Sequence, residues 1–133
     1  MVDCIFCQVA RGDAKSWKVY ENETVYAFLD IHPANPYHTL IIPKNHYENI
    51  FDIPEEELLS VIKVVKKLVN LYQDKLGIEN VQIINSSGPE AQQDVFHCHF
   101  HIVPRSTDDG QDVVWTTHPE MSEQFDEMLK KLQ

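Results

Sequence analysis

The feature that most constrains the fold is the stretch 93–105, which reads QDVFHCHFHIVPR. Histidines and apolar residues alternate in its middle, in the order His97, Cys98, His99, Phe100, His101 and Ile102. Successive side chains of a β-strand point to opposite faces, so a strand would separate the three imidazoles from the apolar side chains. The β-forming residues around this run and the proline that ends it favour a strand over a helix. We therefore predict a strand with an apolar core face and an imidazole face that lines a polar site.

Three neighbouring imidazoles would repel one another if all were charged, so some of them must stay neutral near pH 7. Neutral imidazoles suit proton transfer, nucleophilic attack or metal ligation. The alternative is a polar edge strand that carries its histidines by chance. The alternating apolar face argues against this alternative, because it indicates a strand that is paired inside a sheet.

The composition limits the class of partner. The chain has 133 residues, enough for one domain with a core, and a net charge of -10. This charge disfavours nucleic acid and anionic membranes, so a phosphate-bearing ligand has to be met by local donors. No apolar run reaches the length of a membrane span, no leader pattern opens the chain, and the three cysteines are too few for a disulfide scaffold. We expect a cytoplasmic protein that binds neither nucleic acid nor membrane.

The order of the remaining elements predicts an α+β domain with one five-stranded antiparallel sheet, one long helix, a short N-terminal helix and a C-terminal helix. The other four strands are expected at residues 18–21, 24–29, 38–42 and 81–84, and the short helix at 4–11. The C-terminal helix, at residues 119–132, would bury Phe125, Met128, Leu129 and Leu132.

The long helix is expected at residues 52–76. Asp52 and Glu55 have the spacing of an N-terminal capping box, Pro54 suits the first turn, and Gly77 suits the end. Apolar residues recur along it at helical spacing, from Leu58 and Val61 to Tyr72 and Leu76. This stripe belongs to the core or to a partner surface.

The run of three histidines, preceded by Gln93, resembles the signature of the histidine triad (HIT) family. The resemblance extends to the motifs CIFC at 4–7, AFLDI at 27–31 and HTLIIPKNH at 38–46, which are similar to the Hint-like branch of bacterial type. It covers nearly the whole chain up to Arg105. It implies a single HIT domain over residues 1–133, with a core at about 1–105 and a C-terminal extension at about 106–133.

The resemblance implies a nucleotide hydrolase that forms a nucleotidyl-histidine intermediate. His99, at the centre of the run, is the expected nucleophile toward phosphorus. His101 would donate a hydrogen bond to a phosphate oxygen or protonate the leaving group, and it favours hydrolysis of nucleoside phosphoramidates or dinucleoside polyphosphates. His38 is similar to the family's fourth histidine, which supports the triad. Gln93 occupies the place of the family's glutamine and would donate to a bridging atom or to the attacking water.

A purine nucleotide or nucleotide conjugate is the implied ligand. Asp30 is similar to the acidic residue that binds both ribose hydroxyls, although a loop-capping role is the alternative. Asn85 is a candidate phosphate donor. Asp94 and Gln92 depart from the family pattern and put in doubt that the loop before the histidines, residues 86–92, positions the phosphate. A carboxylate that pointed inward would repel phosphate. The base would enter an apolar slot formed by residues that could equally belong to the core: Ile5, Phe6 and Phe28.

The Cys4-x-x-Cys7 pair alone is compatible with free thiols, a redox motif or half of a zinc site. The resemblance implies a zinc site completed by His46 and His97. Four protein ligands would make this zinc structural and leave no position open for catalysis.

Two other functions remain open from the sequence: a metal-dependent hydrolase whose triad holds the metal, and a nucleotide-binding scaffold with weak catalysis. The resemblance also implies a homodimer that pairs through the long helix and residues 81–85.

Overall fold

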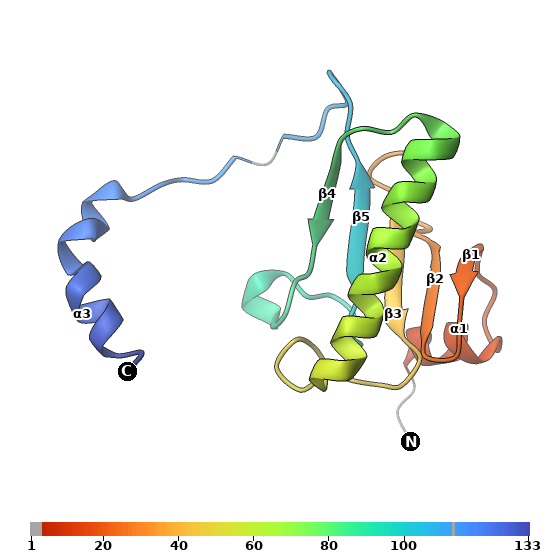
Figure 1. Ribbon diagram of the computed structural model, residues 1–133, viewed down its shortest axis with the longest axis horizontal. Helices are drawn as coiled ribbons and strands as arrows, with labels where there is room; N and C mark the ends of the chain where they lie inside the picture. The colour runs from red at the N-terminus through yellow and green to blue at the C-terminus, as the bar shows by residue number, and fades with distance from the viewer. Residues whose placement is uncertain (1–3, 113) are drawn as a thin grey trace.

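The computed structural model describes residues 4–112 and 114–133 and shows a five-stranded antiparallel sheet with helices on both faces (Figure 1). The strand order is β1-β2-β3-β5-β4. This confirms the predicted α+β fold. The strands are β1 Lys18–Glu21, β2 Val25–Leu29, β3 Thr39–Pro43, β4 Val81–Ile84 and β5 Phe100–Pro104, and the α-helices are α1 Ile5–Arg11, α2 Glu55–Leu76 and α3 Phe125–Lys130.

The strand that carries the histidines is shorter than predicted. Pairing of β5 with β3 begins at Phe100, opposite Ile41, so that His97 and His99 lie before the strand. In that segment the backbone N–H of Cys98 donates to the carbonyl of Tyr47 at 2.7 Å and does not join the β-ladder. The alternation nevertheless persists, because the apolar residues between the histidines pack on one side and the histidines lie on the other.

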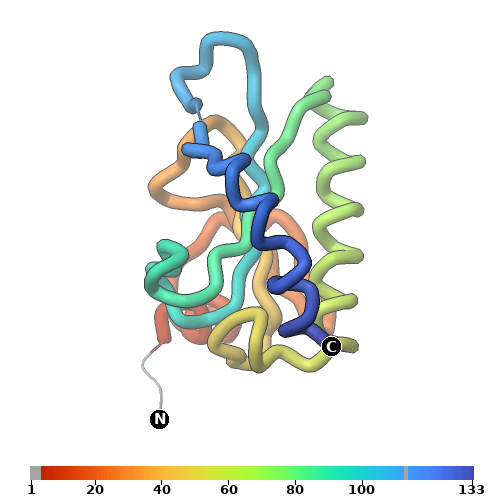
Figure 2. Tube along the Cα trace, turned by 90° about the vertical axis from the view of Figure 1, so that its left-hand side faces the viewer, coloured from red at the N-terminus to blue at the C-terminus, as the bar shows by residue number. Residues whose placement is uncertain are grey.

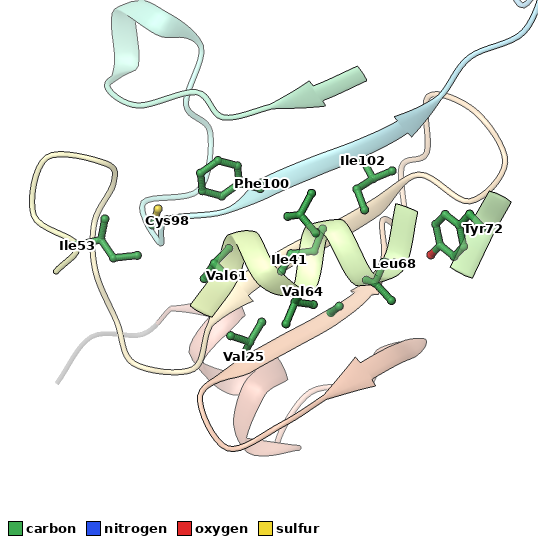
Figure 3. Close-up of a cluster of buried hydrophobic side chains, with 12 residues drawn as sticks. Val25, Ile41, Ile53, Val61, Val64, Leu68, Tyr72, Cys98, Phe100 and Ile102 are labelled. Atoms are coloured by element: carbon green, nitrogen blue, oxygen red, sulfur yellow. The ribbon is translucent and has the colours of Figure 1, made fainter. Parts of the chain in front are cut away.

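The two faces of the sheet carry separate hydrophobic clusters. Helix α2 packs on one face, and α1 covers the other (Figure 2). Cys98, Phe100 and Ile102 belong to the α2 side, among the buried side chains drawn in Figure 3. Phe6 and Phe28 belong to the α1 side. The alternating pattern thus places the histidines on the α1 side of the sheet.

The predicted capping box of α2 is wrong. Helix α2 starts at Glu55, and its N-cap residue Pro54 makes no side-chain capping bond. The Asp52 carboxylate accepts instead from the backbone N–H groups of Asn49 (2.9 Å) and Glu48 (3.0 Å), and these bonds hold the pKa of Asp52 below its usual value. Asp52 therefore closes the turn that leads into α2, and the first turn carries three acidic residues at the positive end of the helix dipole.

The C-terminal helix exists, but the burial predicted for it is wrong. After a 3-10 turn at Pro119–Gln124, α3 extends beyond β4, away from the sheet (Figure 1). The exposed fractions are 52% for Phe125, 41% for Met128, 58% for Leu129 and 82% for Leu132. Helical spacing predicts which face of a helix is apolar but not what covers it, and α1 and α2 already cover the core. Among the described residues, no helix is long and apolar enough to span a membrane.

Candidate active site

A cavity of about 300 Å³ lies where α1, the end of β2 and the histidine segment meet. This volume is at the lower end of the range for small-molecule sites. Its lining includes the three residues predicted for the base slot, Ile5, Phe6 and Phe28. It also includes the polar side chains of Asp30, Asp94, His99 and His101. The cavity therefore offers an apolar slot beside a cluster of imidazoles and carboxylates.

The backbone sets the proton position on His99, which is 3% exposed. Its Nδ1 lies 2.7 Å from the carbonyl oxygen of His97. A carbonyl only accepts, so Nδ1 carries the hydrogen and, in the neutral ring, Nε2 keeps its lone pair. The ring packs edge-on against Phe6, with centroids 5.1 Å apart. The ring of His99 is therefore fixed in place, and its unprotonated Nε2 lies beside the cavity, as nucleophilic attack requires.

The proton positions on His38 and His101 follow from one backbone donor. The N–H of Ala34 donates to Nδ1 of His38 at 2.9 Å, so the proton of neutral His38 is on Nε2. This Nε2–H donates to Nδ1 of His101 at 2.9 Å, which leaves the proton of His101 on its Nε2. Burial lowers the pKa of His101 to about 4 and also lowers the pKa of His38. His101 is therefore a neutral hydrogen-bond donor at pH 7.

Asp30 both caps a turn and lines the cavity. Its Oδ1 accepts a hydrogen bond from the backbone N–H of His32 at 2.8 Å, which is the loop-capping role given above as the alternative. Its Oδ2 lies 3.5 Å from Nε2 of His38. The loop that carries it is tied to β5, because the side chain of Asn35 donates to the carbonyl of Pro104 and to Asp109, both at 2.9 Å. This loop therefore holds Asp30 and His38 in fixed positions.

The side-chain amides of Gln93 and Asn85 bond to other parts of the protein in this structure. Gln93 is buried; its Nε2 donates to the carbonyls of Glu48 (2.7 Å) and Val95 (3.0 Å), and its Oε1 accepts from the N–H of Gly88 (2.8 Å). Nδ2 of Asn85 donates to the carbonyl of His99 at 2.9 Å. Both side chains therefore position the histidine segment from behind the cavity. The contacts with phosphate and water that the sequence analysis assigns to them stay predictions, since a residue type does not reveal which neighbours occupy its donors.

The side chains of Cys4, Cys7, His46 and His97 meet in one cluster, with all four ligand atoms within 4.8 Å of one another. Nε2 of His97 donates to the carbonyl of Pro43 at 2.7 Å, so the lone pair of Nδ1 faces Cys4 Sγ at 3.4 Å and Cys7 Sγ at 3.5 Å. His46 Nδ1 lies 3.3 Å from Cys7 Sγ. A tetrahedral zinc with ordinary bond lengths has nitrogen–sulfur edges of about 3.6 Å. The donor set and its spacing fit zinc.

A redox motif fits the cysteine pair less well. Burial and the hydrogen bond with Cys4 raise the pKa of Cys7 to about 11, whereas a reactive redox thiol has a lowered pKa.

A second group of metal-ligand types consists of Asp30, His38 and His101. The nitrogen of His38 that faces Asp30 and His101 carries a proton, because the other ring nitrogen accepts from Ala34. A protonated nitrogen cannot bind a metal. This geometry argues against a metal-dependent hydrolase built on these histidines.

Comparison with known proteins identifies the family. The HIT domain family model matches residues 11–108, most of the chain. The chain belongs to the HIT domain family. An uncharacterised HIT-like protein of Methanocaldococcus jannaschii is 44% identical to it over 129 residues, which are 97% of this chain and 98% of that protein. The adenosine 5′-monophosphoramidase of Schizosaccharomyces pombe is 34% identical over 119 residues, which are 89% of this chain and 86% of that protein.

Crystal structures of other HIT proteins share the fold. A HIT family protein from Bacillus anthracis superposes with a TM-score of 0.89 at 35% identity, over 98% of this chain and 94% of that chain. A zinc-bound histidine triad family protein from Mycobacterium smegmatis superposes with a TM-score of 0.77 at 30% identity, over 98% of both chains.

Two kinds of functional group in this HIT protein escaped sequence reasoning. Backbone groups, the N–H of Ala34 and the carbonyls of Pro43 and His97, set the proton positions on the histidines. Every residue has such groups, so no sequence signal could have found them. Lys15 and Ser16 also line the cavity. They lie in the polar loop that follows α1. The sequence does not reveal that this loop borders the cavity, so these two residues were not predicted.

Proposed function

We propose that this HIT protein is a nucleotide-binding hydrolase of the Hint-like branch that acts through a nucleotidyl-histidine at His99. Its substrates are nucleoside phosphoramidates or dinucleoside polyphosphates. The observation that carries the proposal is the free Nε2 of His99 beside the cavity, fixed by the 2.7 Å bond between Nδ1 and the carbonyl of His97. The phosphoramidase relative of Schizosaccharomyces pombe supports the same class of reaction.

In the bound state, the base occupies the apolar slot formed by Ile5, Phe6 and Phe28, and Asp30 accepts hydrogen bonds from the ribose hydroxyls. This orientation directs the α-phosphate toward His99 and His101 at the polar end of the cavity. The neutral Nε2–H of His101 donates to a non-bridging phosphate oxygen, where negative charge grows in the transition state. His38 keeps His101 in this tautomer.

The reaction has two displacements. The lone pair on His99 Nε2 forms a bond to phosphorus, and the bond from phosphorus to the leaving group breaks with its electron pair on the leaving atom. Water then attacks phosphorus, the phosphorus–nitrogen bond breaks, and its electron pair returns to Nε2. A proton of the water passes to solvent. The carbonyl of His97 holds Nδ1–H throughout and stabilises the ring while it carries positive charge.

Replacing the nucleophile tests this proposal. We expect His99→Gly to lower the rate of hydrolysis of adenosine 5′-phosphoramidate by about three orders of magnitude or more, because it removes the imidazole whose unprotonated Nε2 lies beside the cavity. The matched control is His118→Gly, since His118 lies exposed in the C-terminal segment. Near wild-type turnover by folded His99→Gly would contradict the proposal. A wild type that binds nucleotide without turnover would favour the nucleotide-binding scaffold.

The cysteine–histidine cluster would hold a structural zinc through Cys4, Cys7, His46 and His97. Zinc there would tie the N-terminus to the segment that enters β5, and it would supply no open coordination position for catalysis. The zinc-bound relative from Mycobacterium smegmatis supports this assignment. Cys4, Cys7 and Cys98 form no disulfide with one another, which is consistent with a reducing compartment such as the cytoplasm.

The protein would act as a homodimer. Leu59 and Ile62 on α2 are 54% and 40% exposed, and Ile83 on the edge strand β4 is 44% exposed. A two-fold contact through α2 and β4 would cover these side chains and the open sheet edge. We further assign residues 1–133 to one HIT domain, with a core at about 1–105 and a C-terminal extension at about 106–133.

A further inference from the structure

The Asp94 carboxylate lies at the mouth of the cavity, next to the proposed nucleophile. Its Oδ1 is 3.8 Å from Nε2 of His99. The same oxygen accepts the N–H of Val95 at 2.9 Å, which holds the carboxylate in this position. The Asp94 side chain is 82% exposed, so it is not part of the packed core. Its place at the edge of the cavity indicates contact with the part of a substrate that projects toward solvent.

The geometry of displacement at phosphorus decides which part that is. The nucleophile and the leaving atom lie roughly in line on opposite sides of phosphorus. With His99 Nε2 at about 3.2 Å from phosphorus before attack, the leaving atom is about 5 Å from Nε2. The base and ribose contact the apolar slot and Asp30, so the leaving group projects away from them, on the side of His99 and the exposed Asp94.

The charge of Asp94 has opposite effects on the two substrate classes that remain open. A nucleotide leaving group of a dinucleoside polyphosphate carries several negative charges, which a carboxylate repels. A phosphoramidate must leave as an amine, and its nitrogen becomes positive when it takes up a proton. Apart from histidines, the charged residues that line the cavity are Lys15, Asp30 and Asp94, and the chain carries a net charge of -10. The surroundings therefore do not cancel the field of Asp94.

We propose that Asp94 determines specificity at the leaving group and directs the enzyme to nucleoside phosphoramidates with an amine leaving group, in preference to dinucleoside polyphosphates. This rests on the proposed function and narrows its substrate class. The substrate nitrogen takes a proton from solvent, next to the Asp94 carboxylate. His99 Nε2 then bonds to phosphorus, the phosphorus–nitrogen bond breaks with its electron pair on nitrogen, and a neutral amine departs. The second displacement by water is unchanged.

The test compares two substrates, adenosine 5′-phosphoramidate and diadenosine triphosphate, on the wild type and on Asp94→Asn. The variant keeps the size of the side chain and removes only the charge, and its exposed position lets the protein fold. One unit charge at about 5 Å corresponds to roughly a tenfold effect on each substrate at a solvent-exposed site. We expect the ratio of kcat/KM for phosphoramidate to kcat/KM for triphosphate to fall at least tenfold in Asp94→Asn. Asp74→Asn, which removes the same charge from α2, should leave the ratio as in the wild type.

The ratio of the two kcat/KM values distinguishes a role of Asp94 at the leaving group from a purely structural role. If Asp94 only held His99, both substrates would lose activity equally and the ratio would not change, which would overturn the inference. If the ratio is unchanged while His99→Gly inactivates the enzyme toward both substrates, the inference fails and the proposed function stands. A wild type that hydrolyses neither substrate would contradict the proposed function itself.

Discussion

The backbone N–H of Ala34 sets the direction of the hydrogen bond between His38 and His101. It donates to Nδ1 of His38, and the proton of His38 is thereby placed toward His101. His101 then has one hydrogen left, on the nitrogen that faces the cavity. In the same way, the carbonyls of His97 and Pro43 fix the tautomers of His99 and His97. The roles of the histidines therefore depend on main-chain groups, which side-chain substitutions other than a change of Ala34 to proline leave in place.

Burial of neutral His101 predicts a dependence of stability on pH. Its pKa is about 4 in the folded protein, against an ordinary value of 6.5. Above pH 6.5 neither state binds this proton. Between pH 6.5 and 4 the unfolded chain binds it and the folded protein does not, so the free energy of unfolding falls as the pH is lowered through this window. Asp52 and Glu21 have lowered carboxyl pKa values and act only at still lower pH.

Thermal unfolding at pH 7.5 and pH 5 measures this contribution. We expect Tm to fall more between these values in the wild type than in His101→Gln, because glutamine does not take up a proton. His118→Gln is the matched control, since an exposed histidine has no buried neutral form to lose, and it should behave as the wild type. Equal falls in Tm for the wild type and His101→Gln would show that His101 is not held neutral by the fold.

At the scale of elements, the order of the strands and helices predicted the sheet, and the alternation of residues 97–102 predicted that the histidines and the apolar side chains between them lie on opposite faces. It did not predict where the strand begins, because Tyr47 and Asn85 take the hydrogen bonds of the segment before Phe100. The resemblance to HIT proteins named Cys4, Cys7, His46 and His97 as one cluster, and the structure brings their ligand atoms together. From spacing alone, only the two cysteines could have been paired.

The proposed zinc ties three elements together: α1, the segment after β3 and the segment before β5. We expect about one zinc per chain in protein purified without chelator, and lower zinc content and Tm in Cys4→Ser. Serine keeps the capping position that Cys4 holds at the start of α1, so the change removes mainly the sulfur ligand. Activity should fall less than in His99→Gly.

Cys98→Ala is the matched control for zinc content, because Cys98 is a buried core thiol on the other side of the segment. Its zinc content should equal that of the wild type. The zinc assignment would be wrong if the purified protein held no zinc and Cys4→Ser unfolded at the wild-type temperature.

At the scale of the whole molecule, α2, β4 and the C-terminal segment each carry exposed apolar side chains, as do several loops. A C-terminal helix was predicted at residues 119–132; α3 covers Phe125–Lys130 after a 3-10 turn, and the prediction that its apolar side chains are buried was wrong. Met121, Phe125 and Leu129 are 46%, 52% and 58% exposed. A second copy placed against α2 and β4 would be within reach of this segment, which extends on the same side as β4 (Figure 1).

Light scattering tests the dimer. We expect twice the chain mass of 15.5 kDa at micromolar concentration, and a shift toward the monomer in Ile62→Asp, because a charge on the apolar face of α2 opposes pairing. Lys67→Asp is the control for charge on the same helix, because Lys67 lies over the ring of Tyr20 on β1, at the sheet edge opposite β4. A wild-type mass of 15.5 kDa at this concentration would exclude the dimer.

The central claim is a covalent bond between His99 and the nucleotide. Mass spectrometry of the intact protein, quenched within milliseconds to seconds of mixing with adenosine 5′-phosphoramidate, tests it most directly. We predict a transient adduct with the mass of one adenylyl group, located on His99 after digestion and absent from His99→Gly. Rapid turnover without any adduct, or an adduct on another residue that persists in His99→Gly, would contradict the account.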